Sequence, residues 1–202
     1  MKTIIIDCGH GGVDSNNKYT TAPAKMFTFP TGEIAYEGYY NRLTGKLLGE
    51  YLKDVYTIFY TVAPSNPIDL SLKDRIKFVN MFSVSDAILI SLHSNASSSH
   101  TARGFEVWTS IGETKSDKLA TLVGEQIKEA FPNSRFRADM IDGDLDKESN
   151  FYVLKNSKCP AILLENLFFD NYEDFNLLRN SNFREKLAYS ISKGIKKYLN
   201  NE

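Results

Sequence analysis

Short apolar runs alternate along this chain with longer segments whose apolar residues recur at helical spacing. A run of about four to eight residues is the length of one strand, and a segment of about ten or more is long enough for a helix. When strands and helices alternate, the strands pair in a mostly parallel sheet and the helices cover it. The 202 residues therefore predict one α/β domain that spans residues 1–202.

The spacing also predicts where the elements lie. Strands are expected at six places: residues 3–7, 55–61, 87–92, 104–109, 134–138 and 161–165. Helices are expected over residues 37–53, from Ser71 onward, over 114–131 and over 182–199. Ser71 followed by Asp74 is a capping pattern. Two long loops, 11–36 and 139–150, should lie at the carboxyl edge of the sheet, since long loops in a compact domain are usually functional.

Charge and apolar content argue against several classes of protein. The formal net charge is −1, whereas a nucleic-acid-binding domain usually carries a basic face. No apolar run approaches the roughly 18 residues that cross a bilayer. No signal peptide or polybasic anchor is visible either. We expect a monomer that is made in the cytoplasm, with no membrane anchor and no nucleic acid as a partner.

Three of the predicted strands end in residues that could carry chemistry. His10 follows the run Ile4-Ile5-Ile6, and His93 follows the run Ile88-Leu89-Ile90. Ligands bind at the carboxyl ends of strands in such sheets, and neutral imidazole is a common metal ligand. Glu165 closes a third apolar run, where a charge is costly unless it is paired or functional. Two histidines and a glutamate at strand ends indicate a metal-dependent hydrolase.

A catalytic zinc site needs a third protein ligand and an open position for water. Glu37 is the expected third ligand, because it begins a predicted helix whose start faces the strand ends. Asn41 lies one turn later on the same helical face and could orient that ligand. Glu33 competes with Glu37 for this position. Cys8 is a conceivable thiolate ligand, although a small buried residue is the simpler interpretation.

Glu165 is expected to be the base that moves protons during hydrolysis and not a metal ligand. The alternative is a buried ion pair between Glu165 and Arg75 or another cation. Each strand-end histidine also has an ordinary interpretation, His10 as a turn residue between glycines and His93 as a satisfied core residue. His100 lies beside a run of serines and is expected to be exposed to solvent.

An acidic segment spans residues 142–148 and contains Asp142, Asp144, Asp146 and Glu148. Its composition suggests a calcium site. However, it lacks the full twelve-residue loop with a terminal glutamate that such sites use. We therefore expect a solvated loop.

Several motifs occur in one order along nearly the whole chain. They are Ile5-Ile6-Asp7-Cys8-Gly9-His10-Gly11-Gly12, Glu37 with Asn41, residues 72–75 with Asn80, residues 90–96, residues 104–107, residues 153–155 and residues 159–165. In this order they resemble the zinc-dependent N-acetylmuramoyl-L-alanine amidases that have a type-3 catalytic domain. Those enzymes cut peptidoglycan.

The resemblance implies a fold, a metal and a reaction. The implied fold is a twisted, mostly parallel sheet of about six strands with helices on both faces. The implied cofactor is one Zn²⁺ per chain, bound by His10, Glu37 and His93, with Glu165 as the catalytic glutamate. Three further residues are implied to orient a ligand or to bind substrate: Asn41, Arg75 and Asn95. The implied reaction is hydrolysis of the amide bond between N-acetylmuramic acid and L-alanine in peptidoglycan.

The chain departs from the family pattern in ways that bear on its biology. Cys8 stands where the family usually has proline, and Asn166-Leu167-Phe168-Phe169 replaces the usual Gly-Phe. The segment between Thr109 and Cys159 is too short for the autoinhibitory helix of some cell-division members. This favours an enzyme similar to a phage or prophage lysin, which reaches the wall after holin-type release. Two alternatives stay open: another zinc peptidase or carboxypeptidase that acts on peptidoglycan, and a metal-free wall-binding regulatory module.

Overall fold

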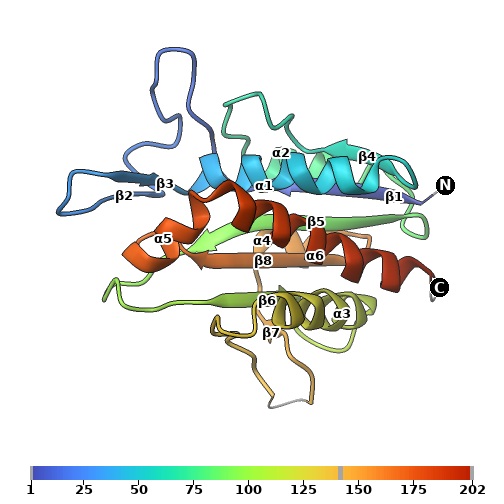
Figure 1. The fold of residues 1–202 in the computed structure, drawn as a ribbon. Helices are drawn as coiled ribbons and strands as arrows, with labels where there is room; N and C mark the ends of the chain where they lie inside the picture. Colours follow the sequence, from blue (N-terminus) through green and yellow to red (C-terminus); the bar gives the residue numbers. More distant parts are fainter. Residues whose placement is uncertain (1, 141–142, 201–202) are drawn as a thin grey trace.

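The structure, a computed structural model, describes residues 2–140 and 143–200. Its centre is a six-stranded sheet in the order β4-β1-β5-β8-β6-β7 (Figure 1). In that order the strands are Thr57–Tyr60, Thr3–Cys8, Ala87–Asn95, Ala161–Phe168, Phe105–Thr109 and Lys147–Glu148. Strand β1 pairs in parallel with both β4 and β5, and β5 pairs in parallel with β8. The carboxyl ends of these four strands therefore meet at one edge.

Strand β6 runs antiparallel to β8, and β7 runs parallel to β6. The prediction of a mostly parallel sheet with about six strands is therefore confirmed. Strands β1, β5 and β8 are nearly continuous apolar runs, as expected for strands that are covered on both faces. The edge strand β4 is only partly buried.

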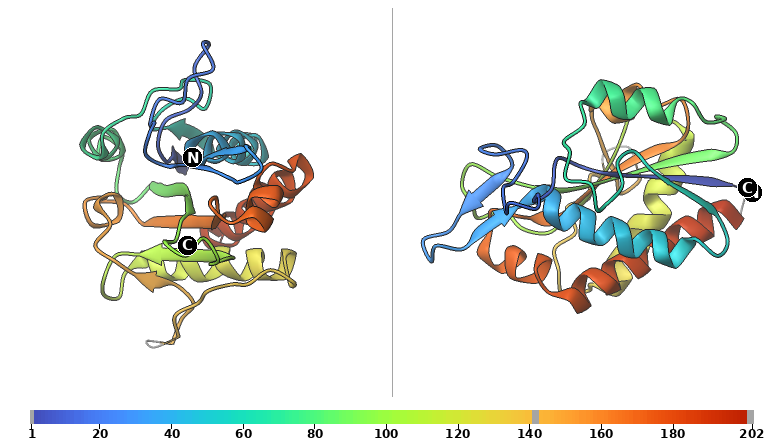
Figure 2. Two further views of the ribbon diagram at one scale, coloured as in Figure 1. Left: turned by 90° about the vertical axis from the view of Figure 1, so that its left-hand side faces the viewer. Right: turned by 90° about the horizontal axis from the view of Figure 1, so that it is seen from above.

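Three long helices cover one face of the sheet. They are α1 (Glu37–Leu52), α3 (Lys115–Ala130) and α6 (Ser181–Asn200). The left view of Figure 2 shows all three on the same side of the strands. Ile4, Ile6 and Ile90 point into this core, and each is fully buried. Burying an isoleucine side chain contributes roughly 1.5–3 kcal/mol.

The other face is covered by α2 (Leu72–Val79) and the short helix α4 (Tyr152–Lys155). Ile5, Leu89 and Leu163 point toward these helices. Successive residues of β1 thus alternate between two cores, because side chains in a strand alternate between its faces. The expectation of helices on both faces is confirmed.

Helix starts agree with the capping signals in the sequence. The Ser71 hydroxyl accepts a hydrogen bond from the Asp74 amide at the start of α2. Thr114 and Asp117 form a capping box at the start of α3. Each such cap is worth about 1 kcal/mol.

The strand predicted at residues 134–138 is wrong. This segment makes only an isolated parallel bridge between Phe105 and Phe136 in the part of the chain that the structure describes. Further along β6, Trp108 and Thr109 pair with β7 at the same edge. Strand β7 lies in the segment expected to be a solvated loop. Asp146, just before β7, is buried. Asp142 lies outside the described residues.

Two further elements differ from the sequence prediction. The loop over 11–36 contains a hairpin of β2 (Met26–Thr28) and β3 (Ile34–Tyr36). Helix α5 (Tyr172–Leu178) follows β8 and packs beside that hairpin, at the carboxyl edge of the sheet (Figure 1). The hairpin and α5 therefore lie together at this edge of the sheet.

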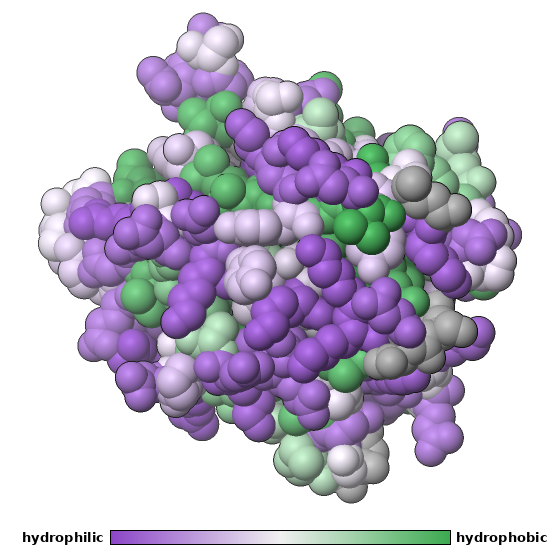
Figure 3. All heavy atoms as spheres, turned by 45° about the vertical axis from the view of Figure 1, so that its right-hand side comes forward, coloured by the Kyte–Doolittle hydropathy of each residue, from purple (hydrophilic) through white to green (hydrophobic). Residues whose placement is uncertain are grey.

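The surface is polar over most of the face drawn in Figure 3, and its apolar atoms gather in small groups. Among the described residues, no helix combines the length and the apolar character needed to cross a bilayer.

Candidate metal centre

His93 lies near the carboxyl end of β5, next to a register irregularity between His93 and Asn95. Its Nδ1 atom is 3.0 Å from Oε1 of Glu37. The imidazole ring lies directly against Gly9, where an added Cβ would be 2.3 Å from Cε1 of His93. Gly9 is therefore required by the close approach of this ring, which explains a glycine at the end of β1.

His10 occupies a rare backbone conformation for a residue with a side chain. Its φ angle is +63°, in the left-handed region. The His10 carbonyl accepts hydrogen bonds from Arg42 Nη1 at 2.6 Å and Arg75 Nη2 at 3.3 Å. Non-glycine residues in such conformations cost about 1–3 kcal/mol and cluster at functional sites. Two arginines thus hold a strained turn that directs the imidazole toward His93, with ring centroids 4.9 Å apart.

Glu37 is the first residue of α1, and its side chain is 1% exposed. Its Oε1 atom accepts a hydrogen bond from the Ser94 amide at 3.2 Å. Asn41 Nδ2 lies 3.5 Å from the same oxygen and also donates to the Gly9 carbonyl at 3.3 Å. Asn41 therefore contacts the Glu37 carboxylate from one turn along the helix.

His10, Glu37 and His93 each present one donor atom, and these atoms lie within 4.8 Å of one another. His10 Nε2 and Glu37 Oε2 are 3.3 Å apart, yet both are buried without a hydrogen-bond partner. Two nitrogen donors and one carboxylate oxygen are a common donor set of catalytic zinc, which keeps its fourth position open. In the described part of the chain, this is the one such group of histidine, cysteine or acidic residues.

Charge within the group is tightly coupled. Burial alone would raise the pKa of Glu37, but the neighbouring imidazoles of His10 and His93 hold this pKa far below its usual range. Burial alone would lower the pKa of His93, but the hydrogen bond and the charge of Glu37 raise it. The Glu37 carboxylate thus stays negative and favours the charged form of the His93 imidazole. This electrostatic arrangement also suits a cation.

Glu165 lies on β8 directly opposite His93 in the strand register. Its Oε2 atom is buried and has no hydrogen-bond partner. Burial raises the pKa of Glu165 to about 7; nearby Glu37 adds to this increase, and His93 opposes it. A carboxyl whose pKa lies near neutrality suits a group that takes and returns a proton.

Arg75 does not pair with Glu165. Its guanidinium binds Asp7 at 2.7 Å and Asp69 at 3.1 Å, and it donates to the Cys8 carbonyl at 2.8 Å. The alternative of a Glu165–Arg75 ion pair is therefore excluded by the geometry. Arg75 instead fixes the backbone that leads from β1 to His10.

Asp7 is a site residue that the sequence analysis did not single out. It is 1% exposed and accepts hydrogen bonds from Arg75, Thr61 and Ser91. Burial would raise the pKa of Asp7, but Arg75 and the Thr61 hydroxyl lower it. The signal was present in the sequence, because Asp7 closes an apolar run in the same way as Glu165.

Asn95 turns toward a second charged group beside the cleft. Its Nδ2 atom donates to Glu106 Oε2 at 3.0 Å. Glu106 Oε1 also binds Arg137 at 2.7 Å and Lys147 at 2.9 Å. Glu106 is the register partner of Glu165 in the antiparallel pairing of β6 and β8. This charged cluster therefore lies next to Glu165 on the side of β6.

The competing ligands are engaged elsewhere. Glu33 accepts a hydrogen bond from the Tyr172 hydroxyl at 2.8 Å and forms an ion pair with Arg179. Cys8 is fully buried, and burial raises the pKa of its thiol to about 12, which opposes a thiolate. His100 is exposed as expected, although it pairs with Asp170 at 2.8 Å.

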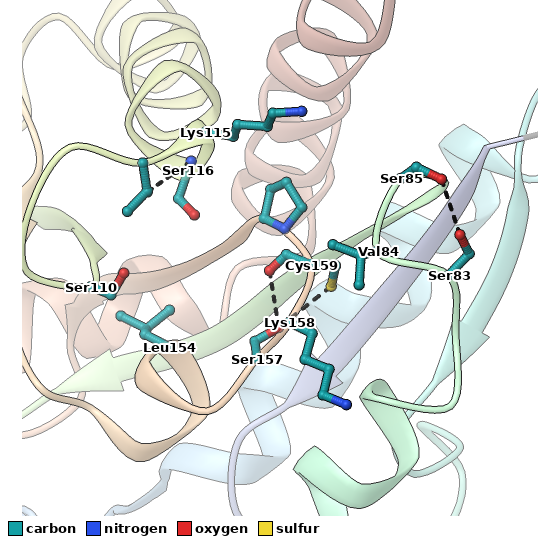
Figure 4. Close-up of a pocket in the computed structure, with 12 residues that line it drawn as sticks. Ser83, Val84, Ser85, Ser110, Lys115, Ser116, Leu154, Ser157, Lys158 and Cys159 are labelled. Carbon is teal, nitrogen blue, oxygen red and sulfur yellow. Dashed lines mark hydrogen bonds between the residues drawn. The ribbon is translucent and has the colours of Figure 1, made fainter.

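A pocket of about 410 Å³ opens onto the two histidines. Its walls come from β1 and the turn after it, from β5, and from α2 and the turn before it: Asp7, His10, Asp69, Leu70, Ser71, Leu72, Arg75 and His93. A different pocket, of about 670 Å³, lies at the opposite edge of the sheet around Cys159 and Lys158 (Figure 4). It contains none of the predicted site residues, whereas the pocket at the histidine edge contains His10, Arg75 and His93.

The chain is similar to known proteins over nearly its whole length. A family model described as N-acetylmuramoyl-L-alanine amidase matches residues 4–197. The sporulation-specific N-acetylmuramoyl-L-alanine amidase of Bacillus subtilis is 28% identical over 203 residues, covering 99% of this chain and 69% of that protein. The endolysin of Bacillus phage SPP1 is 26% identical, covering 98% of this chain and 66% of that protein. A solved N-acetylmuramoyl-L-alanine amidase from Clostridium difficile 630 is 29% identical, with a TM-score of 0.77 over 100% of this chain and 98% of that one.

Proposed function

Because the chain belongs to the N-acetylmuramoyl-L-alanine amidase family, a family of hydrolases that act on peptidoglycan, we propose that it is a zinc-dependent member. The bond cleaved is the amide between the lactyl carbonyl of N-acetylmuramic acid and the amine of L-alanine. The observation that carries the zinc proposal is the convergence of His10, Glu37 and His93 with two buried donor atoms unpaired.

Zinc held by these three residues would act as a Lewis acid and would lower the pKa of water to near neutrality. The protein must keep the three donors in place, and it does so through residues behind them. Asn41 and the Ser94 amide orient the Glu37 carboxylate. Such supporting contacts typically matter 10- to 100-fold, as an order of magnitude, for metal affinity or activity.

Glu165 is proposed as the proton carrier. Its carboxylate takes a proton from the water that attacks the lactyl carbonyl. The same group then returns that proton to the nitrogen of L-alanine as the amide bond breaks. The buried, unpaired Oε2 atom and the raised pKa of Glu165 support both transfers.

Arg75 and Asn95 are proposed as supporting residues. Arg75 holds the carbonyls of Cys8 and His10, and thereby the strained turn that presents His10. Asn95 orients Glu106, which adds negative charge beside Glu165. Neither side chain is placed to act as a metal ligand.

The test is mass spectrometry of peptidoglycan fragments after digestion, together with zinc analysis of the protein. A muramic acid product with a free carboxyl, plus a peptide that begins with L-alanine, supports the proposal. A new carboxyl within the peptide would instead identify a peptidase. No cleavage at all by zinc-loaded protein would favour a wall-binding regulatory module.

We also propose that residues 1–202 act as one catalytic domain, as a monomer, and that the enzyme works in the manner of a lysin. The similarity to the SPP1 endolysin supports the last point. Expression in a bacterium should leave cells intact until the inner membrane is permeabilised, and then lyse them. Light scattering of the purified protein checks the monomer.

A further inference from the structure

Lys25 occupies an unusual position at the rim of the candidate metal centre. Its φ angle is +59°, in the left-handed region that non-glycine residues seldom adopt. Its carbonyl accepts a hydrogen bond of 3.0 Å from the Glu37 amide, at the start of α1. The backbone of Lys25 is thus tied to the helix that supplies a proposed ligand.

The side chain of Lys25 faces the centre of the site. Its Nζ atom is 3.8 Å from Glu37 Oε2, and the side chain is 49% exposed. Its charge also reaches Glu165, where it lowers the pKa of that carboxyl in part. Lys25 therefore lies beside the proposed metal ligand, is half exposed to solvent, and acts through its charge on the proposed proton carrier.

Two other cations near the site are fully used by the protein. Arg75 binds Asp7 and Asp69, and Arg42 donates to the carbonyls of His10, Asn66 and Ile68. Both arginines lie beneath the His10 turn and are buried. Lys25 differs from both because it is solvent-accessible and its closest charged partner is a proposed metal ligand.

The hairpin that follows Lys25 is firmly attached to the rest of the domain. Glu33 binds Tyr172 and Arg179 of the α5 region. Phe29 stacks on Phe175 with ring centroids 4.8 Å apart. A strained residue at the base of an anchored hairpin keeps a defined position, as a substrate-binding residue requires.

A metal ion bound at the site would change the electrostatic partner of the Lys25 ammonium group. A divalent cation at the three donors would engage Glu37 Oε2 and repel the ammonium group. The ammonium would then need another anion, or water. In the substrate, the lactyl carboxyl of muramic acid forms the scissile amide and carries no charge. The anionic groups close to the scissile bond therefore belong to the stem peptide.

We propose that Lys25 is a specificity-determining residue that pairs with a free carboxylate of the stem peptide next to the scissile bond. This inference rests on the proposed function. It assigns to the hairpin loop the recognition of peptide charge, separate from metal binding and from proton transfer.

The test compares two soluble muramoyl peptides that differ in one group, a free carboxylate or a carboxamide on the peptide residue after L-alanine. Binding is measured by calorimetry with zinc-loaded Glu165→Gln protein, which removes turnover. Cleavage of both ligands is measured with the otherwise unmodified enzyme. Lys25→Met removes the charge at similar length, Lys25→Arg restores it, and Lys18→Met is the control at an exposed lysine of the same loop.

We expect Lys25→Met to weaken binding of the carboxylate ligand about tenfold and to leave the carboxamide ligand unchanged. KM should rise for the carboxylate substrate at unchanged zinc content, and any change in kcat should be the same for both substrates. Lys25→Arg should recover most of the preference. Equal effects of Lys25→Met on both ligands, or no effect on either, would overturn the inference about Lys25. Cleavage by the wild-type enzyme would still support the proposed function in that case. If the wild type cleaves neither ligand, both proposals fail.

Discussion

His93 and Glu165 lie opposite each other in the parallel pairing of β5 and β8. One carries a donor atom of the candidate metal centre, and the other is the proposed proton carrier. Neighbouring strands are roughly 4.8 Å apart. Both residues lie toward the carboxyl edge of the sheet. The separation of the two groups is therefore set by backbone hydrogen bonds and not by a loop.

Glu165→Gln separates proton transfer from metal binding. Glutamine keeps the shape of the side chain but cannot carry the proton. We expect turnover to fall by about 10²–10⁴-fold while zinc content and the thermal unfolding temperature of the loaded protein stay close to those of the wild type. Elemental analysis alongside the activity assay checks this. Loss of zinc together with activity would make Glu165 a ligand.

Metal content should depend on Glu37 and His93 but not on Glu33. His93→Ala and Glu37→Gln each remove one donor atom, so we expect each variant to lose the one zinc ion that the wild-type chain binds. Glu33→Gln is the matched control, because Glu33 is committed to Tyr172 and Arg179. Zinc retained in full by His93→Ala would contradict the assignment.

The raised pKa of Glu165 predicts how the stability of the zinc-free protein depends on pH. The folded protein holds the Glu165 proton up to about pH 7, whereas the unfolded chain releases it near the ordinary pKa of 4.5. Between these values the folded state binds more protons, so Glu165 makes stability fall as pH rises. Glu165→Gln removes this effect. Its advantage in unfolding temperature over the wild type should be absent at pH 4 and grow to a plateau above pH 7. An advantage that is equal at all pH values would show that burial of the charge is not its cause.

Gly9→Ala tests the close contact beneath His93. An added Cβ would lie 2.3 Å from the imidazole, so the ring or the strand end must move. Overpacking of this kind costs about 1–3 kcal/mol. We expect weaker zinc binding and a lower unfolding temperature, measured by competition with a chelator and by calorimetry. Unchanged zinc affinity would mean that the ring position is not critical.

The sequence predicted the central strands and the long helices well because each has a strong local signal. Residues 3–7, 87–92 and 161–165 are apolar runs, and α1, α3 and α6 have a clear helical period. The strand ends also indicated which side chains would meet, since parallel strands share one carboxyl edge. The structure does bring the donor atoms of His10, Glu37 and His93 together.

Other features depend on partners that are distant in the chain, so the local sequence does not predict them correctly. Residues 134–138 have strand-like composition, but only one bridge to Phe105 is available to them. The two-residue strand β7 exists because it pairs with Trp108 and Thr109, although its own sequence is charged. The pairing of Glu33 with Arg179 joins segments far apart in the chain. Lys25 likewise reaches Glu37 only through a left-handed turn that its sequence does not announce.

The three donors of the candidate metal centre come from the turn after β1, the start of α1 and the end of β5. Cys8 and Cys159 are free and buried, so the described chain has no covalent cross-link. An ion bound by these donors would join segments that the unfolded chain leaves far apart, and it would close two long loops at once. Metal supply would then govern the lifetime of the folded enzyme as well as its chemistry. A chelating environment would expose it to proteolysis before it reached its substrate.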